Sequence, residues 1–135
     1  MFKLNGRIDY LGRPVVRLET PTHETFLALV DTGFNGALML ADQDARALGF
    51  QVDLTAIKAN LAGNIVEKMT GGRGTIMWMG QPHSIEIIVS PNKPALRRDD
   101  EPVALIGTAL LTPHLLLIDY AANTVEIEAQ RPRSA

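Results

Sequence analysis

Short apolar stretches separated by turn-forming residues run along most of this chain and predict a protein built mainly of β-strands. Residues 26–30 and 103–106 are continuous apolar runs, typical of strands buried on both faces. Residues 6–10 and 14–20 flank Leu11-Gly12-Arg13, which predicts a first hairpin. Further strands are predicted at residues 37–40, 75–79, 85–89, 115–118 and 125–128.

Two segments predict short helices. Residues 42–48 begin with acidic side chains, which the partial positive charge of a helix N-terminus favours, and Gly49 is typical of a helix end. Residues 108–112 can form one or two helical turns before Pro113 stops them. Residues 91–102 are polar and bounded by prolines, which predicts a loop. The pattern therefore predicts a mainly β domain with two short helices.

Length and composition narrow the class of protein. A chain of 135 residues fits one domain, residues 1–135, and its 46% hydrophobic and 21% charged residues are ordinary for a globular protein. The net charge of −2 gives no electrostatic basis for binding nucleic acid or an anionic membrane. No apolar run reaches the roughly 18 residues of a spanning helix, and the N-terminus shows no apolar signal core. We therefore expect a cytoplasmic protein with no nucleic-acid or membrane partner.

The chain offers little for metal or thiol chemistry. It has no cysteine, which excludes disulfides, zinc–thiolate sites, iron–sulfur clusters and cysteine nucleophiles. His23, His83 and His114 lie far apart without the spacing of a metal site, and Ser84 lacks the glycines that surround a serine nucleophile. His114 follows Pro113 at a predicted helix end, so we expect it at the surface or in a cap. We expect no metal and no cofactor.

A carboxylate at the end of the buried strand 26–30 is the strongest candidate for chemistry. Asp31 follows this run directly, so it enters a partly desolvated environment of the kind that acid–base catalysis uses. Gly33 permits close approach of the backbone, and Thr32 supplies a hydroxyl that can bond across a neighbouring backbone. By itself, Asp-Thr-Gly is more typical of a plain turn than of a catalytic loop.

A second motif changes that interpretation. Residues 104–111 read Ala-Leu-Ile-Gly-Thr-Ala-Leu-Leu, a buried strand followed by a glycine and a short helix. Together with Leu29-Val30-Asp31-Thr32-Gly33, this motif resembles the retropepsin-like aspartic proteases, and among them the bacterial and archaeal relatives in which Phe follows Asp-Thr-Gly. The order of predicted elements resembles this family over nearly the whole chain. The resemblance implies a single-lobed, closed β-barrel with short helices, in which the glycine strand crosses beneath the Asp31 loop.

The resemblance also implies an aspartic endopeptidase that is active as a two-fold homodimer. One chain supplies one such Asp, whereas the chemistry needs two carboxylates that share a proton. One Asp31 would activate a water molecule, and the protonated Asp31 of the second copy would polarise the scissile carbonyl. Thr32 of each chain would bond across the axis, and Gly33 completes the catalytic loop. The implied partners are a second copy of the chain and a peptide or protein substrate.

A flap hairpin within residues 51–90 is part of the same resemblance, and its tip has two possible positions. A tip at residues 61–64 gives long, even arms, and Gly63-Asn64 is typical of a hairpin turn. A tip at Gly71-Gly72 would leave only residues 75–79 as a returning strand. We prefer the first position and expect a β-bulge at residues 71–74. The expected substrate-binding residues are Leu61, Ala62, Gly63, Asn64, Ile106 and Gly107.

Three positions depart from the family pattern. Phe34 stands where many members carry Ala or Ser, so the carboxylate loses a hydrogen-bond donor. Asn35 and Thr108 replace an Asp and an Arg that form an ion-pair network at the retroviral dimer contact. Dimerisation would therefore rest on other surfaces, for which the terminal strands, residues 2–4 and 125–128, are candidates by edge pairing.

Two other interpretations stay open. The first is a dimeric peptide-binding or scaffold module of the same fold, whose dyad is weak or inactive. The second is a monomeric domain of a larger assembly, which could not form a dyad at all.

Overall fold

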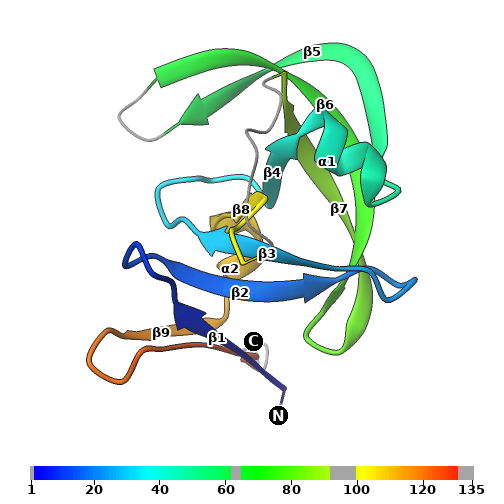
Figure 1. Cartoon of the computed structure of the whole chain (residues 1–135). Helices are drawn as coiled ribbons and strands as arrows, with labels where there is room; N and C mark the ends of the chain where they lie inside the picture. Colours follow the sequence, from blue (N-terminus) through cyan, green and yellow to red (C-terminus); the bar gives the residue numbers. More distant parts are fainter. Residues whose placement is uncertain (1, 62–64, 92–99, 131–135) are drawn as a thin grey trace, which may run out of the picture.

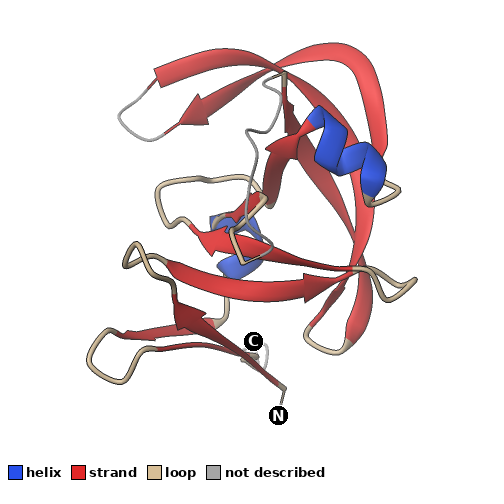
Figure 2. Cartoon of the chain, in the orientation of Figure 1, coloured by secondary structure: helices blue, strands red, loops and turns tan. Residues whose placement is uncertain are grey.

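The computed structural model describes residues 2–61, 65–91 and 100–130, with only the backbone of residues 54–61 and 65–68. Within these ranges the chain is mainly β, with two short helices (Figures 1 and 2). The first part contains β1 (Lys3–Ile8), β2 (Pro14–Glu19), β3 (Thr25–Val30), β4 (Leu38–Ala41), α1 (Asp42–Ala47), β5 (Gln51–Leu61), β6 (Ile65–Trp78) and β7 (Gln81–Ser90). The last part contains β8 (Ala104–Ile106), α2 (Thr108–Leu111), β9 (Leu115–Asp119) and β10 (Thr124–Glu128). Neither described helix has the length and apolar character needed to cross a membrane.

The strands form one sheet in the order β5-β6-β7-β4-β8-β3-β2-β1-β10-β9. A pairing of Glu19 with Met77 joins β2 to β6 and closes the strands β2, β3, β8, β4, β7 and β6 into a barrel. The pairs β3–β8 and β4–β7 are parallel, and β8 lies between β3 and β4, which both precede it in the chain. The predicted mainly β fold with a closed barrel is therefore confirmed.

The barrel interior is filled by alternate side chains of its strands, as the two-residue period of a strand requires. Complete burial of one such side chain stabilises the fold by about 1.5–3 kcal/mol. The buried runs 26–30 and 103–106, predicted as strands, form β3 and β8 at the centre of the sheet. The buried barrel side chains are Val16, Leu18, Phe26, Ala28, Val30, Leu38, Leu40, Ile76, Trp78, Ile85, Ile87, Val89, Ala104 and Ile106.

The long hairpin predicted within residues 51–90 is formed by β5 and β6. These strands pair antiparallel as far as Leu61 and Ile65, and residues 62–64 of the expected tip lie outside the described residues. Gly71 and Gly72 lie within β6 and pair with β7, so the alternative tip at these glycines is wrong.

The bulge expected at residues 71–74 is also wrong. The β6–β7 ladder runs without a shift through these residues, and the irregularity lies in β5, between Val52 and Ala56. Glycine is required at two of these positions because neighbouring atoms lie close to the backbone. A Cβ at Gly72 would lie 2.3 Å from the Gln51 carbonyl oxygen. A Cβ at Gly74 would lie 2.5 Å from the ring of Phe50.

Of the two terminal segments expected at an edge, residues 125–128 are not at one. β10 lies between β1 and β9 and is hydrogen-bonded on both sides, so residues 125–128 are not an edge. Residues Lys3 and Leu4 of β1 are paired with Glu128 and Ile127 of β10. Within the described ranges, the outer strand at this end of the sheet is β9, which pairs with β10 alone. One open edge of this region therefore belongs to β9. The β1–β2 ladder covers only residues 6–8 of β1, so residues 3 and 4 also keep one side without a partner among the described strands, as expected.

Candidate functional site

Asp31 follows the last residue of β3, where the strand leaves the barrel for the loop that leads to β4 (Figure 1). Its backbone N–H donates to the Ile106 carbonyl at 2.9 Å, and its Oδ1 accepts a hydrogen bond from the Gly33 N–H at 2.9 Å. Asp31 is half-buried, whereas Thr32 and Gly33 are exposed. The carboxylate is therefore fixed by its own loop and remains accessible from one side.

The glycine strand lies beneath this loop. β8 pairs in parallel with β3 through Val30 and Ile106, and the Gly107 N–H donates to the Ala37 carbonyl at 3.1 Å. The first N–H groups of a helix have no partner within the helix, and here the loop supplies acceptors for two of them. Thr108 N–H donates to the Phe34 carbonyl at 2.8 Å, and Ala109 N–H donates to the Gly36 carbonyl at 3.2 Å. The structure thus brings together the two motifs on which the resemblance rests.

Gly107 leaves no room for a side chain. A Cβ at this position would lie 2.3 Å from the Phe34 carbonyl oxygen and 2.4 Å from the Gly36 carbonyl oxygen. Both distances are shorter than any real contact of a Cβ, so a larger residue would push the Asp31 loop away from β8. The glycine allows the backbone of the loop to lie directly on the strand that supports it.

Phe34 is part of this support. The Phe34 side chain is 2% exposed. A Cβ added at Gly36 would lie 2.5 Å from its ring, and a Cβ added at Gly107 would lie 2.6 Å from it. The ring therefore occupies the space that the two glycines leave. Among the described residues, the Asp31 carboxylate accepts one hydrogen bond, from the Gly33 N–H, in agreement with the expected loss of a donor at position 34.

The expected substrate-binding residues do not lie together on an exposed surface. Ile106 is fully buried in the barrel core, and Gly107 is buried under the Asp31 loop. Both support the loop and are shielded from a peptide. Of the expected flap tip, Leu61 ends β5, whereas Ala62, Gly63 and Asn64 lie outside the described residues.

A cavity of about 580 Å³ is lined by residues of the Asp31–β4 loop, of α2 and of the strands β6 and β7. Asn35, Gly36 and Ala37 of the loop line it, together with the charged residues Asp53, Arg73 and Glu86. Asp31 is not among the lining residues. This cavity is therefore separate from the candidate carboxylate.

A polar contact at the far end of α2 was missed by the sequence analysis. Trp78 Nε1–H donates to His114 Nε2 at 3.3 Å, and the two rings meet edge to face with centroids 5.8 Å apart. Because Nε2 accepts, neutral His114 carries its proton on Nδ1, which is buried and has no partner within the described ranges. Burial lowers the pKa of His114, and the nearby His83 lowers it further. His114 is thus half-buried and does not lie free at the surface, whereas its backbone N–H donates to the Leu111 carbonyl at 2.7 Å, as expected of a capping residue at the end of α2.

Exposed apolar side chains lie on one face of β9, the strand with the open edge, and directly after it. Leu115 is 44% exposed, Leu117 is 48% exposed, and Tyr120, directly after the strand, is 65% exposed. We call these three residues the β9 patch. The turn after β9 contacts the end of β1, where the Ile8 N–H donates to Asn123 Oδ1 at 3.2 Å. In Figure 1 the Asp31 loop and the β9–β10 turn project toward the same side of the view.

Comparisons with known proteins do not identify the chain. No protein family model matches it, and no curated protein matches it. Within the described ranges, no group of three or more His, Asp or Glu side chains is placed to hold a metal ion. A function must therefore be inferred from the residues around Asp31.

Proposed function

We propose that the protein is an aspartic endopeptidase of the retropepsin-like kind, which hydrolyses peptide bonds as a two-fold homodimer. One observation carries the proposal: Asp31 lies at the end of a central strand, on a loop whose backbone is bonded to Gly107 and to the start of α2. Rigid support beneath a carboxylate and access from one side are the conditions that a shared dyad requires. The fold expected from the resemblance agrees with this arrangement.

The chemistry needs two copies of Asp31, because two carboxylates in contact cannot both ionise at low cost and so share one proton. The ionised Asp31 takes a proton from a water molecule whose oxygen attacks the scissile carbonyl carbon. The protonated Asp31 gives its proton to the carbonyl oxygen, which forms the tetrahedral intermediate. Collapse of that intermediate breaks the C–N bond, and the leaving nitrogen takes a proton from the dyad. No cofactor takes part.

The strand that carries the β9 patch supports the proposal of a homodimer. An edge strand with exposed leucines and no bulge, proline or lysine to protect it is ready to pair with another strand. Antiparallel pairing of two β9 strands about a two-fold axis at Leu117 would place Leu116 opposite Ile118, and Leu115 opposite Asp119, of the other copy. The contact would be apolar, and the two carboxylates of Asp119 would lie at opposite ends.

One observation favours the rival function, a dimeric peptide-binding or scaffold module. Within the described residues, the Asp31 carboxylate receives one hydrogen bond, from the Gly33 N–H, and Phe34 cannot supply another. A module of this kind would form the same dimer and bind peptides without cleaving them. Cleavage is therefore the measurement that separates the two functions.

The test is Asp31→Asn, which keeps the size of the side chain and removes its charge. Cleavage of an unfolded peptide library between about pH 3 and pH 8 is followed by mass spectrometry, with sedimentation to check the dimer. We expect Asp31→Asn to lose at least about 100-fold in rate while it stays folded and dimeric. Asp42→Asn, which changes a carboxylate on α1 that binds Arg46, is the matched control and should cleave like the wild type.

Unchanged cleavage by Asp31→Asn would overturn the peptidase proposal. A wild-type dimer that binds peptides and cleaves none of them would establish the rival function. A chain that stays monomeric at micromolar concentration would exclude both, because neither the dyad nor the dimeric module could form.

A further inference from the structure

The strands β1, β10 and β9 turn one face toward the core and the other toward solvent. Leu116 and Ile118 of β9 pack against the core, and Val125 and Ile127 of β10 belong to it. The residues between them point the other way, because successive side chains of a strand alternate between its two faces. We call this solvent side the outer face. It consists of the odd-numbered residues of β1 and β9 and the even-numbered residues of β10.

The register of the sheet arranges the side chains of the outer face in rows. Leu115 is paired with Glu128 and Leu117 with Glu126, and Glu128 is paired on its other side with Lys3. Directly opposite residues of antiparallel strands have their side chains on the same face. The outer face therefore carries leucines along β9, carboxylates along β10 and basic residues along β1.

The two leucines are the exception on this face. The solvent side of an antiparallel sheet normally carries polar residues, and the outer positions of β1 and β10 are all polar. Pairing of two β9 edges, as in the proposed dimer, joins the backbones and leaves the faces of the strands open. In such a dimer the leucines of both copies form one exposed apolar strip. A strip of this kind marks a surface that another molecule covers.

The carboxylates beside the leucines are only partly neutralised. Glu126 Oε2 lies 3.6 Å from Lys3 Nζ. Among the described residues, neither Asp119 nor Glu128 forms an ion pair, and Arg7 of β1 lies two strands away from Asp119. Negative charge therefore borders the leucines and is available to a basic partner.

A cavity of about 470 Å³ lies at one end of the leucine row. Its walls combine two carboxylates with the exposed ring of Tyr120. A cation is attracted both by a carboxylate and by the face of an aromatic ring, and the stem of a Lys or Arg side chain packs on apolar surface. The cavity thus fits a basic side chain of a partner. It is lined by Leu117, Ile118, Asp119, Tyr120, Thr124 and Glu126.

We propose that the outer face of β9 and β10 is a docking surface for a basic amphipathic segment of another protein. Its apolar side chains lie on the leucines, and its Lys or Arg side chains lie beside the carboxylates. A second copy stacked on this face cannot match both rows: with leucines on leucines, its carboxylates meet like charges or nothing. The carboxylates also repel an anionic membrane surface. The inference goes beyond the proposed function, because a single copy carries the face and no bond is broken there.

The probe is a synthetic peptide of about 12 residues, with leucines on one helical face and lysines beside them. A helix of this length spans about 18 Å, which matches the roughly 17 Å of β9 (Leu115–Asp119). Binding is measured by fluorescence anisotropy with the full chain carrying Asp31→Asn, so that the proposed peptidase does not cleave the probe. We expect the probe to bind at least about 10-fold more tightly than the same residues in scrambled order, or than a version with Glu in place of Lys.

Two variants of the outer face test the two rows separately. Leu117→Ser should weaken binding at least about 10-fold. Glu126→Gln combined with Glu128→Gln should weaken it by about 3- to 10-fold at low salt and reduce its dependence on salt. β10 is paired on both sides, so this double variant leaves the edge proposed for dimerisation as it is.

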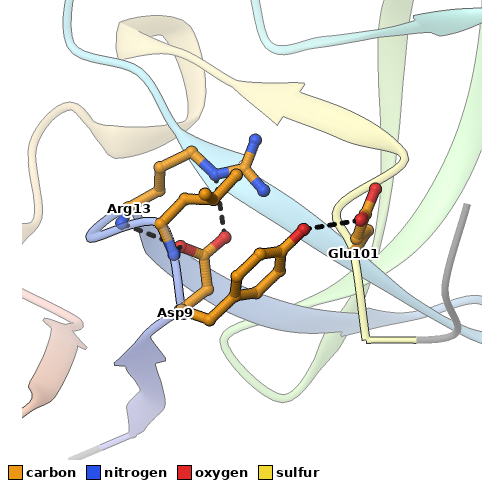
Figure 3. Close-up of polar contacts among 5 residues, drawn as sticks. Asp9, Arg13 and Glu101 are labelled. Carbon is orange, nitrogen blue, oxygen red and sulfur yellow. Dashed lines mark hydrogen bonds and ion pairs between the residues drawn. The ribbon is translucent and has the colours of Figure 1, made fainter.

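Leu11→Ser is the matched control for the leucine. Leu11 is 60% exposed, and its turn between β1 and β2 is held by contacts of its own. Asp9 Oδ1 accepts the Leu11 backbone N–H at 3.0 Å, and Asp9 Oδ2 accepts Arg13 Nε–H at 2.8 Å (Figure 3). Removal of the Leu11 side chain should therefore leave the turn folded and the affinity within about 2-fold of that without it.

Asp42→Asn combined with Glu86→Gln is the matched control for the carboxylates. Asp42 lies 2.9 Å from Arg46, and Glu86 lies 4.0 Å from Arg73, so both form exposed ion pairs as Glu126 does. The change in net charge is the same as in the outer-face variant. This control should keep both the affinity and its dependence on salt.

Vesicles of phosphatidylcholine and phosphatidylserine represent the other kind of occupant. Binding to these vesicles that Leu117→Ser abolishes, without selective binding of the probe, would overturn the proposal in favour of a membrane. It is also overturned if the scrambled peptide binds as tightly as the probe, or if either outer-face variant keeps the full affinity. No step of this test uses catalysis, so a failure of the peptidase proposal leaves the docking surface standing, and the reverse holds as well.

Discussion

The Asp31 loop and the β9 edge differ in what the chain itself supplies. The loop is bonded from below by β8 and α2, and its buried Phe34 leaves no free space under the backbone. β9 has one paired side and one open side within the described ranges, and its leucines are exposed. A single copy of the chain therefore fixes the Asp31 loop by its own contacts. The proposed second carboxylate, in contrast, requires another copy to bind at the unpaired edge of β9.

The largest effect is expected from breaking the support of the loop. Phe34→Ala removes a ring that is 2% exposed and leaves a cavity between Gly36 and Gly107. We expect the free energy of unfolding to fall by about 3–5 kcal/mol, as measured by urea denaturation. Phe2→Ala, at a 45% exposed ring, is the control and should change it by about 0.5 kcal/mol or less. Equal losses would show that the loop does not depend on Phe34.

A smaller effect is expected from blocking the edge. Leu117→Lys places a charge at the centre of the proposed pairing and should weaken self-association by about 10- to 100-fold, as measured by sedimentation. The thermal unfolding of the single chain should stay close to that of the wild type, because Leu117 is 48% exposed. Leu11→Lys, at an exposed leucine of the turn between β1 and β2, is the matched control. A dimer that tolerates Leu117→Lys would place the interface elsewhere.

The smallest effect concerns pH, at the junction between α2 and β9. The pKa of His114 is lowered in the fold, so below its ordinary value of 6.5 the unfolded chain binds a proton that the folded chain does not. Stability should therefore be complete above this pH, and should fall as the pH drops below it, by at most about 1.4 kcal/mol per pH unit. The fall should level off below the pKa of the folded state.

His114→Gln should remove this dependence, because Gln can still accept from Trp78 but does not titrate. His23→Gln, at an exposed histidine bound to Glu19, is the control and should keep the dependence on His114. The measurement is urea denaturation at a series of pH values between about 5 and 8. A pH profile that His114→Gln leaves unchanged would contradict the assignment.

The sequence predicted those parts of the structure that local pattern determines. The apolar runs predicted β3 and β8, whereas the crossing of the glycine strand beneath the Asp31 loop was implied only by the family resemblance. In the sequence, Phe34 indicated only that the Asp31 carboxylate loses a hydrogen-bond donor. The packing of its ring could not be predicted, because it depends on Gly36 and on Gly107, which is distant in the chain. The sequence could not show that residues 125–128 are not an edge. Residue 128 pairs with residue 3, and a register between strands distant in the chain leaves no local mark. Glycines in residues 71–74 indicated a bulge, but they serve contacts with Gln51 and Phe50.

The late position of β8 in the chain has a consequence for biosynthesis. β8 lies between β3 and β4, so the strands on either side of the Asp31 loop cannot meet their common neighbour until the C-terminal part has been translated. Pairings over long stretches of sequence form slowly, because the chain must lose much of its freedom first. A growing polypeptide would therefore carry an unshaped Asp31 loop through most of its synthesis, and the proposed peptidase would have no formed site before β8 is translated.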